Sequence, residues 1–260
     1  TSLSIIAVIY FSVIGYLTFS QTKSWKDSIS IYTSSLENHK APIMYCNLGE
    51  AHFKAGKINE ALADFTEAIK IKPRFPNAFK NRAITYQNLN DWKNAASDYT
   101  SALSYTPNDH SLYLFRANCY KTMEDYENAV KDYTHVIGIN SSIDAYYGRG
   151  ETYGRWNKLV ESINDFSKVI QIKPDYDAAY NNRGIAYSMA GKFTEAINDF
   201  NKAIQLNPKF WNAVYNRSNA YKSAGDLQKA LDDALLARRN GYPVPDEYLN
   251  ALQPKSAPVN

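Results

Sequence analysis

Seven apolar residues recur along this chain at an almost constant interval. Each lies 33 or 34 residues after the one before it, in the order Trp25, Ile58, Trp92, Tyr126, Leu159, Phe193 and Leu227. A period of this length is typical of proteins built from stacked copies of one supersecondary unit. It divides the chain into six units, preceded by a half unit at 23–41, and the units are 42–75, 76–109, 110–142, 143–176, 177–210 and 211–244.

Each unit carries the pattern of two packed helices when its positions are numbered from its own first residue. Position 8 is always small, as Gly49, Ala83, Ala117, Gly150, Gly184 and Ser218. Position 20 is Ala or Ser, and position 24 is aromatic in every unit but the last. Positions 4, 8 and 11 share one face of a helix, as do positions 20, 24 and 27. The small residues let two helices approach closely, and a Pro at position 32 of most units ends the second helix.

The run from Tyr180 to Pro208, YNNRGIAYSMAGKFTEAINDFNKAIQLNP, contains all of these small, aromatic and Pro positions. It resembles the tetratricopeptide repeat (TPR) family, and the resemblance extends from Trp25 to about Val244. The resemblance implies an all-α fold, a right-handed solenoid of helical hairpins. Departures from the family pattern are local and comprise Ser141, Ser162, Ala234 and the segment GRWNKL at 154–159. Because a Gly turn is usual at that last place, we expect a distorted loop there.

The two ends of the chain differ from the repeats. Residues 2–20 carry no charge, and at 1.5 Å per residue they almost match a hydrocarbon core of about 30 Å. We therefore predict a transmembrane helix within 1–22, with the first helix of an additional unit as the alternative. Because the chain starts with Thr1, we expect a fragment or a processed product. Residues 245–260 are predicted to form a short capping helix, with Asp246 as its N-cap, and a disordered tail.

The junction at Trp25 follows the apolar segment almost directly and carries the pattern Trp-x-Asp. A hydrophobic span, such a helix and then TPR units resemble the C-terminal end of polytopic membrane proteins of the glycosyltransferase type, including O-mannosyltransferase-like proteins with TPR tails. This resemblance implies a catalytic membrane part before Thr1, and repeats on the lumenal or periplasmic side. Lys23 and Lys26 instead favour the cytoplasmic side, so the sequence leaves the sidedness open.

Composition and motifs offer little support for catalysis, metal binding or nucleic-acid binding by this chain. A net charge of +3 is too small to indicate nucleic-acid binding. Cys46 and Cys119 fit no metal or redox spacing and are interpreted as packing residues. The four His residues occupy unrelated repeat positions, and no phosphate-binding loop or nucleophile–base set is present. We therefore predict no catalytic residue, no metal, no cofactor and no small-molecule substrate.

Charged residues recur at two positions of the repeat. Position 23 is Asp in all six units, and position 7 is Arg in all but the first, as Arg82, Arg116, Arg149, Arg183 and Arg217. An Arg fork matches a carboxylate well, so the two positions predict a ladder of ion pairs. One register joins each Asp to the Arg of the following unit, as Asp64 to Arg82 or Asp165 to Arg183, and the other joins them within a unit. The first is favoured because it explains the missing Arg of the first unit. The alternative to a structural ladder is a row of Arg that grips an anionic ligand.

The first helices are expected to line a concave face, as in the TPR family, chiefly through positions 2, 5, 9, 12 and 13. In superhelices related to O-GlcNAc transferase, an Asn at position 6 holds a peptide backbone, and an amide suits this because it donates and accepts. Position 6 is Asn in four units but Phe115 and Gly148 in the third and fourth. The predicted peptide-binding residues are Asn47, Asn81, Lys80, Asn118, Lys121, Tyr147, Arg155, Asn181, Asn182, Tyr215, Asn216, Asn219 and Lys222. A simple solvated face is the alternative.

The sequence thus favours a membrane-anchored scaffold that presents a polar, mildly basic groove to a peptide or partner protein. The membrane contact would be made by residues 2–20. The alternative is the acceptor-recruiting C-terminal domain of a membrane glycosyltransferase, whose catalytic part would lie outside this chain. A third hypothesis treats the solenoid as a spacer in an assembly.

Overall fold

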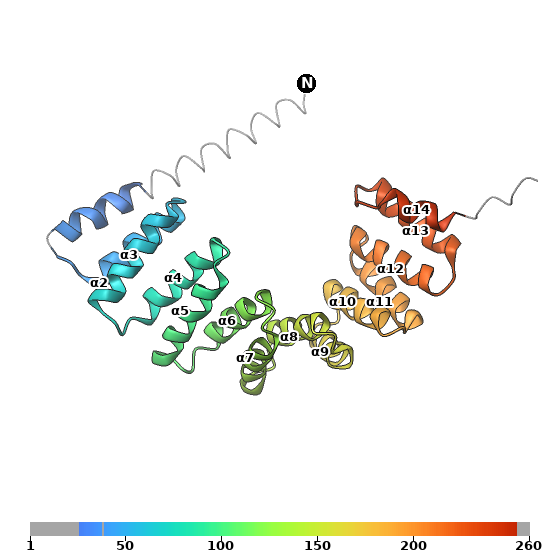
Figure 1. Ribbon diagram of the computed structural model, residues 1–260, viewed down its shortest axis with the longest axis horizontal. Coiled ribbons are helices and arrows are strands. Elements are labelled where there is room, and N and C mark those ends of the chain that lie inside the picture. The colour runs from blue at the N-terminus through green and yellow to red at the C-terminus, as the bar shows by residue number, and fades with distance from the viewer. Residues whose placement is uncertain (1–25, 38, 254–260) are drawn as a thin grey trace, which may run out of the picture. The chain divides into compact units, whose positions relative to one another are not determined.

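The structure is a computed structural model that describes residues 26–37 and 39–253, and every described element in it is helical (Figure 1). Residues 26–37 are helical. The helices that follow are α2 (Pro42–Lys54), α3 (Ile58–Ile71), α4 (Pro76–Asn88), α5 (Trp92–Tyr105), α6 (His110–Thr122), α7 (Tyr126–Ile139), α8 (Ile143–Arg155), α9 (Leu159–Ile172), α10 (Asp177–Met189), α11 (Phe193–Leu206), α12 (Trp211–Ser223), α13 (Leu227–Arg239) and α14 (Asp246–Leu252). The predicted all-α fold is confirmed.

The chain separates into two compact parts, Thr1–Glu124 and Asp125–Asn260. In the N-terminal part, α2 pairs with α3 and α4 with α5 as hairpins, and α6 packs on α5. In the C-terminal part, α7 packs on α8, and the hairpins are α8–α9, α10–α11 and α12–α13 (Figure 1, yellow-green to red). Each second helix also packs on the first helix of the next hairpin. This stacking buries apolar faces that one hairpin would leave exposed.

The core follows the predicted small and aromatic positions. The position-20 residues Ala61, Ala95, Ala129, Ala196 and Ala230 are fully buried. Ser162, which replaces Ala in the fourth unit, is also buried, and its hydroxyl donates to the carbonyl oxygen of Gly150 at 2.8 Å. This hydrogen bond satisfies a polar group inside the core and explains why Ser is tolerated there. Large aromatic side chains at position 24 fill the space beside these small residues.

The turns between paired helices share one backbone geometry. Gly56, Gly191 and Gly225 adopt positive φ in three of them. In the fourth unit Asn157 takes this role with φ 58°, and Trp156, Asn157 and Lys158 donate the same backbone hydrogen bonds as the Gly191 turn. Asn tolerates the left-handed region better than most residues. The expected distortion at 154–159 was therefore wrong.

The C-terminal helix α14 covers the last hairpin. Its Leu249 and Leu252 are buried against a cluster that includes Val214 and Ala237. The N-cap is Pro245, without a side-chain hydrogen bond, so the prediction of Asp246 as the cap was wrong. Asp246 is instead the first residue of the helix, and its carboxylate pairs with Arg238. A capping helix of this kind shields the apolar face that the last unit has no neighbour to cover.

The predicted membrane helix at 1–22 and the predicted tail after 253 lie outside the described residues. Within residues 26–37 and 39–253, no helix is long and apolar enough to cross a bilayer. The described helices from α2 to α13 have 13 or 14 residues, compared with the roughly 20 that a span needs.

Candidate functional site

The recurring Arg and Asp residues pair within a hairpin. Arg183 donates from Nε and Nη2 to the two carboxylate oxygens of Asp199 at 2.7 and 2.8 Å. The same two-bond geometry joins Arg82 to Asp98, Arg149 to Asp165, and Arg217 to Asp233. The register that the sequence favours, with Asp64 bound to Arg82 and Asp165 to Arg183, is therefore wrong. Paired helices of one hairpin bring positions 7 and 23 side by side, so the within-unit register is the one that forms.

The first hairpin replaces the Arg with a different partner. Its position 7 is the buried Leu48, and its position 11 is His52 where the other units have Tyr. The Nδ1 atom of His52 lies 2.6 Å from Oδ2 of Asp64. Burial raises the pKa of Asp64, and the hydrogen bond from His52 opposes that shift. Asp64 of the first hairpin is therefore paired with His52 instead of with an Arg.

Each Arg also reaches the preceding hairpin through its third nitrogen. Nη1 of Arg183 donates to the hydroxyl of Ser167 on α9 at 2.9 Å. Equivalent bonds join Arg82 to Thr66, Arg116 to Thr100, Arg149 to Thr134 and Arg217 to Asn201. The guanidinium of Arg183 also lies 5.7 and 5.8 Å from the ring centroids of Tyr180 and Tyr187. With its donors engaged and its faces covered by aromatic rings, the Arg row is structural rather than a grip for an anionic ligand.

The substitute pair in the first hairpin gives a prediction about coupled residues. Replacing His52 with Tyr should lower the free energy of unfolding by about 1–3 kcal/mol, because Asp64 loses its partner while it stays largely buried. Adding Leu48→Arg to His52→Tyr recreates the arrangement of the other hairpins and should recover most of the loss. Urea unfolding of the two single variants and the double variant checks this. Strictly additive effects of the two substitutions would contradict the coupling.

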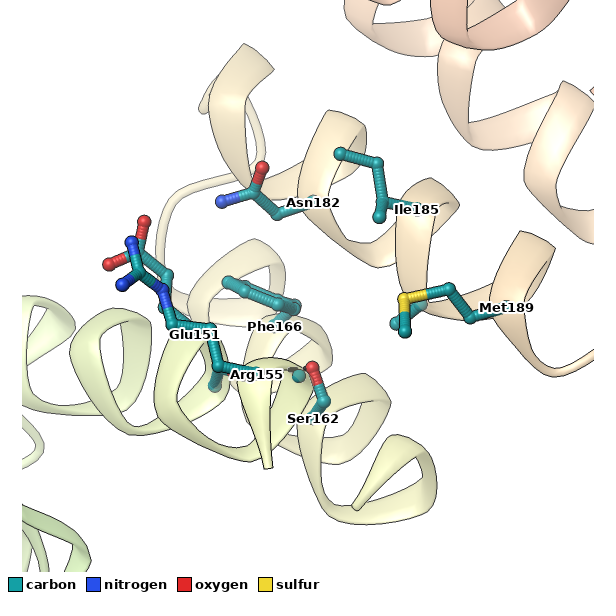
Figure 2. Close-up of a pocket in the computed structure, with 10 residues that line it drawn as sticks. Glu151, Arg155, Ser162, Phe166, Asn182, Ile185 and Met189 are labelled. Carbon is teal, nitrogen blue, oxygen red and sulfur yellow. Dashed lines mark hydrogen bonds between the residues drawn. The ribbon is translucent and has the colours of Figure 1, made fainter. Parts of the chain in front are cut away.

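Two pockets lie between the first helices of neighbouring hairpins. The larger, of about 420 Å³, is formed by α8, α9 and α10 and is shown in Figure 2. It is lined by Gly150, Glu151, Gly154, Arg155, Ser162, Phe166, Asn182, Ile185, Ala186 and Met189. The smaller, of about 210 Å³, is formed by α2, α3 and α4 and is lined by Glu50, Phe53, Lys54, Phe65, Asn81 and Ile84. We call them the C-terminal pocket and the N-terminal pocket.

Three of the predicted peptide-binding residues line these pockets, namely Arg155 and Asn182 in the larger and Asn81 in the smaller. Figure 2 shows Asn182, Ile185 and Met189 along α10, opposite Glu151 and Arg155 of α8, with Phe166 at the base. The remaining predicted residues lie on the first helices outside the pocket linings, and they are Asn47, Lys80, Asn118, Lys121, Tyr147, Asn181, Tyr215, Asn216, Asn219 and Lys222.

The position-6 amides make contacts within the protein. Asn81 donates to Glu50 on the preceding first helix at 2.6 Å, and Asn182 donates to the hydroxyl of Tyr147 at 2.9 Å. Asn216 donates to the side-chain carbonyl oxygen of Asn181 at 2.9 Å. These bonds connect successive first helices, a role that the sequence reasoning did not foresee. Asn181 is only 4% exposed, so it supports the neighbouring helix rather than lining an open groove, contrary to its predicted role.

The gap in the Asn series has a steric cause. Phe at position 24 precedes Asn at the next position 6 in three places, and its ring lies against the small residue of its own hairpin, as Phe200 does at Gly184. Where position 24 is Tyr, the ring also contacts the following helix. Tyr99 stacks on Phe115 with ring centroids 5.7 Å apart, and a Cβ on Gly148 would lie 2.6 Å from the ring of Tyr133. An Asn at position 148 would therefore collide with Tyr133.

At the C-terminal end, α14 covers two predicted groove residues. The ring of Tyr248 lies 5.3 Å from that of Tyr215, and Nζ of Lys222 lies 4.7 Å from the Tyr248 ring centroid. The Tyr248 hydroxyl donates to Oγ of Ser218 at 2.9 Å, since the Ser218 proton is used on the carbonyl oxygen of Ala230. Lys222 and Tyr215 are thus in contact with the protein's own last helix.

The sequence reasoning missed most of the pocket walls. Phe65 and Phe166 were assigned to the core alone, although their rings also form pocket surface. Ile84 and Ile185 at position 9 were overlooked because only polar groove residues were selected. The sequence carried only a partial signal, since Phe at position 24 followed by Asn at the next position 6 occurs at both pockets but also at Phe200 and Asn216.

The two cysteine thiols of the chain are buried. Burial raises the pKa of the thiols of Cys46 and Cys119 to about 11 each, so both stay protonated at neutral pH. Within the described part of the chain, no cluster of three or more His, Cys, Asp or Glu residues is placed to hold a metal ion. The geometry of the pockets instead suits the binding of a side chain.

Family models described as tetratricopeptide repeat match residues 42–75, 110–142, 143–176, 178–210 and 200–232, which together cover more than half of the chain. The chain belongs to the tetratricopeptide repeat family. The matches include the helices that form the C-terminal pocket, and α2 and α3 of the N-terminal pocket. The TPR solenoid predicted from the repeat is therefore confirmed, and the resemblance to glycosyltransferase-like membrane proteins is not shown.

Curated relatives share only short segments with this TPR chain. Serine/threonine-protein phosphatase T of Trypanosoma brucei brucei is 35% identical over 82 residues, which is 32% of this chain and 17% of that protein. Mitochondrial import receptor subunit TOM70 of Rattus norvegicus is 38% identical over 72 residues, or 26% of this chain and 11% of that protein. The chain thus spans less than a fifth of the length of either relative.

Solved structures share the TPR fold over much more of the chain. A tetratricopeptide repeat protein from Parabacteroides merdae has a TM-score of 0.64 at 22% identity, covering 92% of this chain and 95% of that one. YrrB, described as a TPR protein with an unusual peptide-binding site, has a TM-score of 0.63 at 20% identity, covering 70% and 95%. At these identities the likeness establishes the fold alone.

Proposed function

We propose that this TPR chain is a scaffold that binds a peptide, or an exposed segment of a partner protein, along its first helices. The observation that carries the proposal is the C-terminal pocket, which combines an apolar base with polar groups at its rim. Phe166, Ile185 and Met189 supply apolar surface, while Arg155 and Asn182 supply donors. A pocket with an apolar wall and a few convergent polar groups is typical of a ligand site. The unusual peptide-binding site of YrrB, which shares the TPR fold, supports the same class of ligand.

The predicted membrane anchor at residues 2–20 lies outside the described part of the chain, and so does Trp25 of the glycosyltransferase-like junction. Both remain predictions from the sequence. Neither is needed for the proposed binding function, because every residue that forms the two pockets lies between Glu50 and Met189.

Selection from a random dodecapeptide phage library on the full chain tests the proposal. We expect peptides that bind the natural chain and bind the Met189→Glu variant at least about tenfold more weakly, since a bound apolar side chain would remove the added carboxylate from water. Met189 is 55% exposed, so its replacement should leave the fold intact. Val160→Glu on α9 is the matched control, because Val160 is 69% exposed and lies outside the pocket lining.

Two results would count against binding in this pocket. One is the enrichment of no peptide above an unrelated helical control protein. The other is equal weakening by Met189→Glu and Val160→Glu, which would show a non-specific effect of added negative charge. Circular dichroism of both variants verifies that each remains helical.

A further inference from the structure

The two pockets repeat one set of residues with identical spacing. The set is Glu at position 9, a basic residue at position 13, Phe at position 24, then Asn and Ile at positions 6 and 9 of the next unit. In the N-terminal pocket it reads Glu50, Lys54, Phe65, Asn81 and Ile84. In the C-terminal pocket it reads Glu151, Arg155, Phe166, Asn182 and Ile185, each 101 residues later.

This set is not demanded by the stacking of helices. Positions 9 and 13 are Ile84 and Asn88 in the second unit, and Asn118 and Thr122 in the third. A contact that stacking required would recur widely, as the Arg–Asp pair does in the second, fourth, fifth and sixth units, with His–Asp in the first. Recurrence in the first and fourth units alone indicates that the set serves a ligand.

The side chains of the set define the chemistry of that ligand. Phe166 and Ile185 form an apolar base in one pocket, and Phe65 and Ile84 do so in the other. Arg155 and Lys54 are exposed at the rims, and none of the hydrogen bonds or ion pairs found among the described residues engages either cation. Glu50, by contrast, already accepts a hydrogen bond from Asn81.

The charge of the first helices favours an acidic ligand. At positions 2, 5, 9, 12 and 13 of the six units, basic residues outnumber acidic ones. The basic residues are Lys54, Lys80, Lys121, Arg155 and Lys222, and the acidic ones are Glu50, Asp144 and Glu151. A carboxylate beside the apolar group of the ligand would meet Arg155 or Lys54 at the rim.

We propose that each pocket binds one copy of a short peptide motif, an apolar side chain next to an acidic residue, so that one chain takes two copies. The inference rests on the proposed peptide-binding function and specifies its ligand. The C-terminal pocket accepts the larger side chain, because its position 12 is Gly154 where the N-terminal pocket has Phe53. The pocket volumes agree with this difference, since the C-terminal pocket measures about 420 Å³ and the N-terminal pocket about 210 Å³.

Isothermal titration of the full chain with a peptide obtained from the phage selection tests the inference. We expect two peptides per chain with unequal affinities, and an acidic residue next to an aromatic or long aliphatic one in the selected sequences. Arg155→Glu should weaken the tighter site at least tenfold, and Lys54→Glu the weaker one. Gly154→Phe should close the larger pocket, and Phe53→Gly should enlarge the smaller one and tighten binding there.

The substitutions at position 12 are matched to the natural residue of the other pocket. A Cβ on Gly154 would lie no closer than 3.4 Å to Oγ of Ser162, so a side chain can be added there without a backbone clash. Circular dichroism and thermal unfolding of Gly154→Phe confirm the fold before binding is compared.

The outcomes separate this inference from the proposed function. One peptide per chain, bound in a way that Met189→Glu weakens, would overturn the two-copy inference and leave the binding function standing. Basic selected sequences, or tighter binding by Arg155→Glu, would overturn the acidic motif. Selection of no peptide at all would overturn both proposals.

Discussion

Replacing Arg183 with Met is expected to lower the free energy of unfolding by about 3–5 kcal/mol, because Asp199 is left as a buried charge without its partner. The side chains of Arg183 and Asp199 are only 19% and 9% exposed, and two hydrogen bonds join them. The same substitution also removes the bond to Ser167 on the preceding hairpin. Urea unfolding followed by circular dichroism measures the loss. Hydrogen exchange in α10 and α11 locates it, since repeat proteins can unfold in segments.

Arg238→Met is the matched control for this substitution. Arg238 pairs with Asp246, but their side chains are 48% and 75% exposed, so water screens the interaction. Exposed pairs contribute about 0–1 kcal/mol, and we expect a loss within that range. Equal losses in the two variants would contradict the structural importance of the buried pair. A double variant, Arg183→Met with Asp199→Leu, should recover much of the loss, because no buried charge then remains unpaired.

Replacing Gly184 with Val is expected to destabilise the protein by about 1–3 kcal/mol through overpacking. A Cβ at Gly184 would lie 2.7 Å from Cε1 of Phe200, which is closer than two carbon atoms can approach. The ring of Phe200 is 1% exposed and is enclosed by the core, so it has little room to move away. Thermal unfolding of the variant, compared with the natural chain, measures the effect.

Gly138→Val provides the control, since Gly138 also lies within a helix but no other atom would lie within 4 Å of its Cβ. Val has a higher helix propensity than Gly, so this variant should be as stable as the natural chain or slightly more stable. The pair of variants separates the steric effect at Phe200 from the general effect of adding a side chain. A destabilisation of the same size at both positions would refute the steric explanation, whereas rescue of Gly184→Val by Phe200→Leu would support it.

The repeat period and the small and aromatic positions were sufficient to predict the hairpins and their buried faces. The register of the ion pairs was not predictable from spacing alone, because Asp64 to Arg82 spans 18 residues and Arg82 to Asp98 spans 16. Both fit a helical hairpin repeat. The absence of Arg from the first unit then favoured the wrong choice, since the substitute role of His52 depends on a contact between two helices.

The candidate site was predicted less well than the fold. Polar residues were chosen along the first helices, and Arg155, Asn81 and Asn182 do line pockets. The pocket walls, however, also depend on the aromatic residue at position 24, because Tyr at this position contacts the next helix as well. This choice follows from the packing of three helices, so a pattern read along one helix does not reveal it.

Because each of these Arg–Asp pairs forms within one hairpin, whole hairpins can be gained or lost without separating the two partners. Duplicating or deleting the second, fourth, fifth or sixth hairpin copies or removes both partners of a pair together, as for Arg183 with Asp199. Only a neutral hydrogen-bond acceptor such as Ser167 is shared across the junction, and Thr66 or Asn201 serves equally well. Pairs that bridged hairpins would instead have left the Asp of the last hairpin, Asp233, without an Arg partner. The charge pattern therefore makes hairpins interchangeable modules during the lengthening of the repeat.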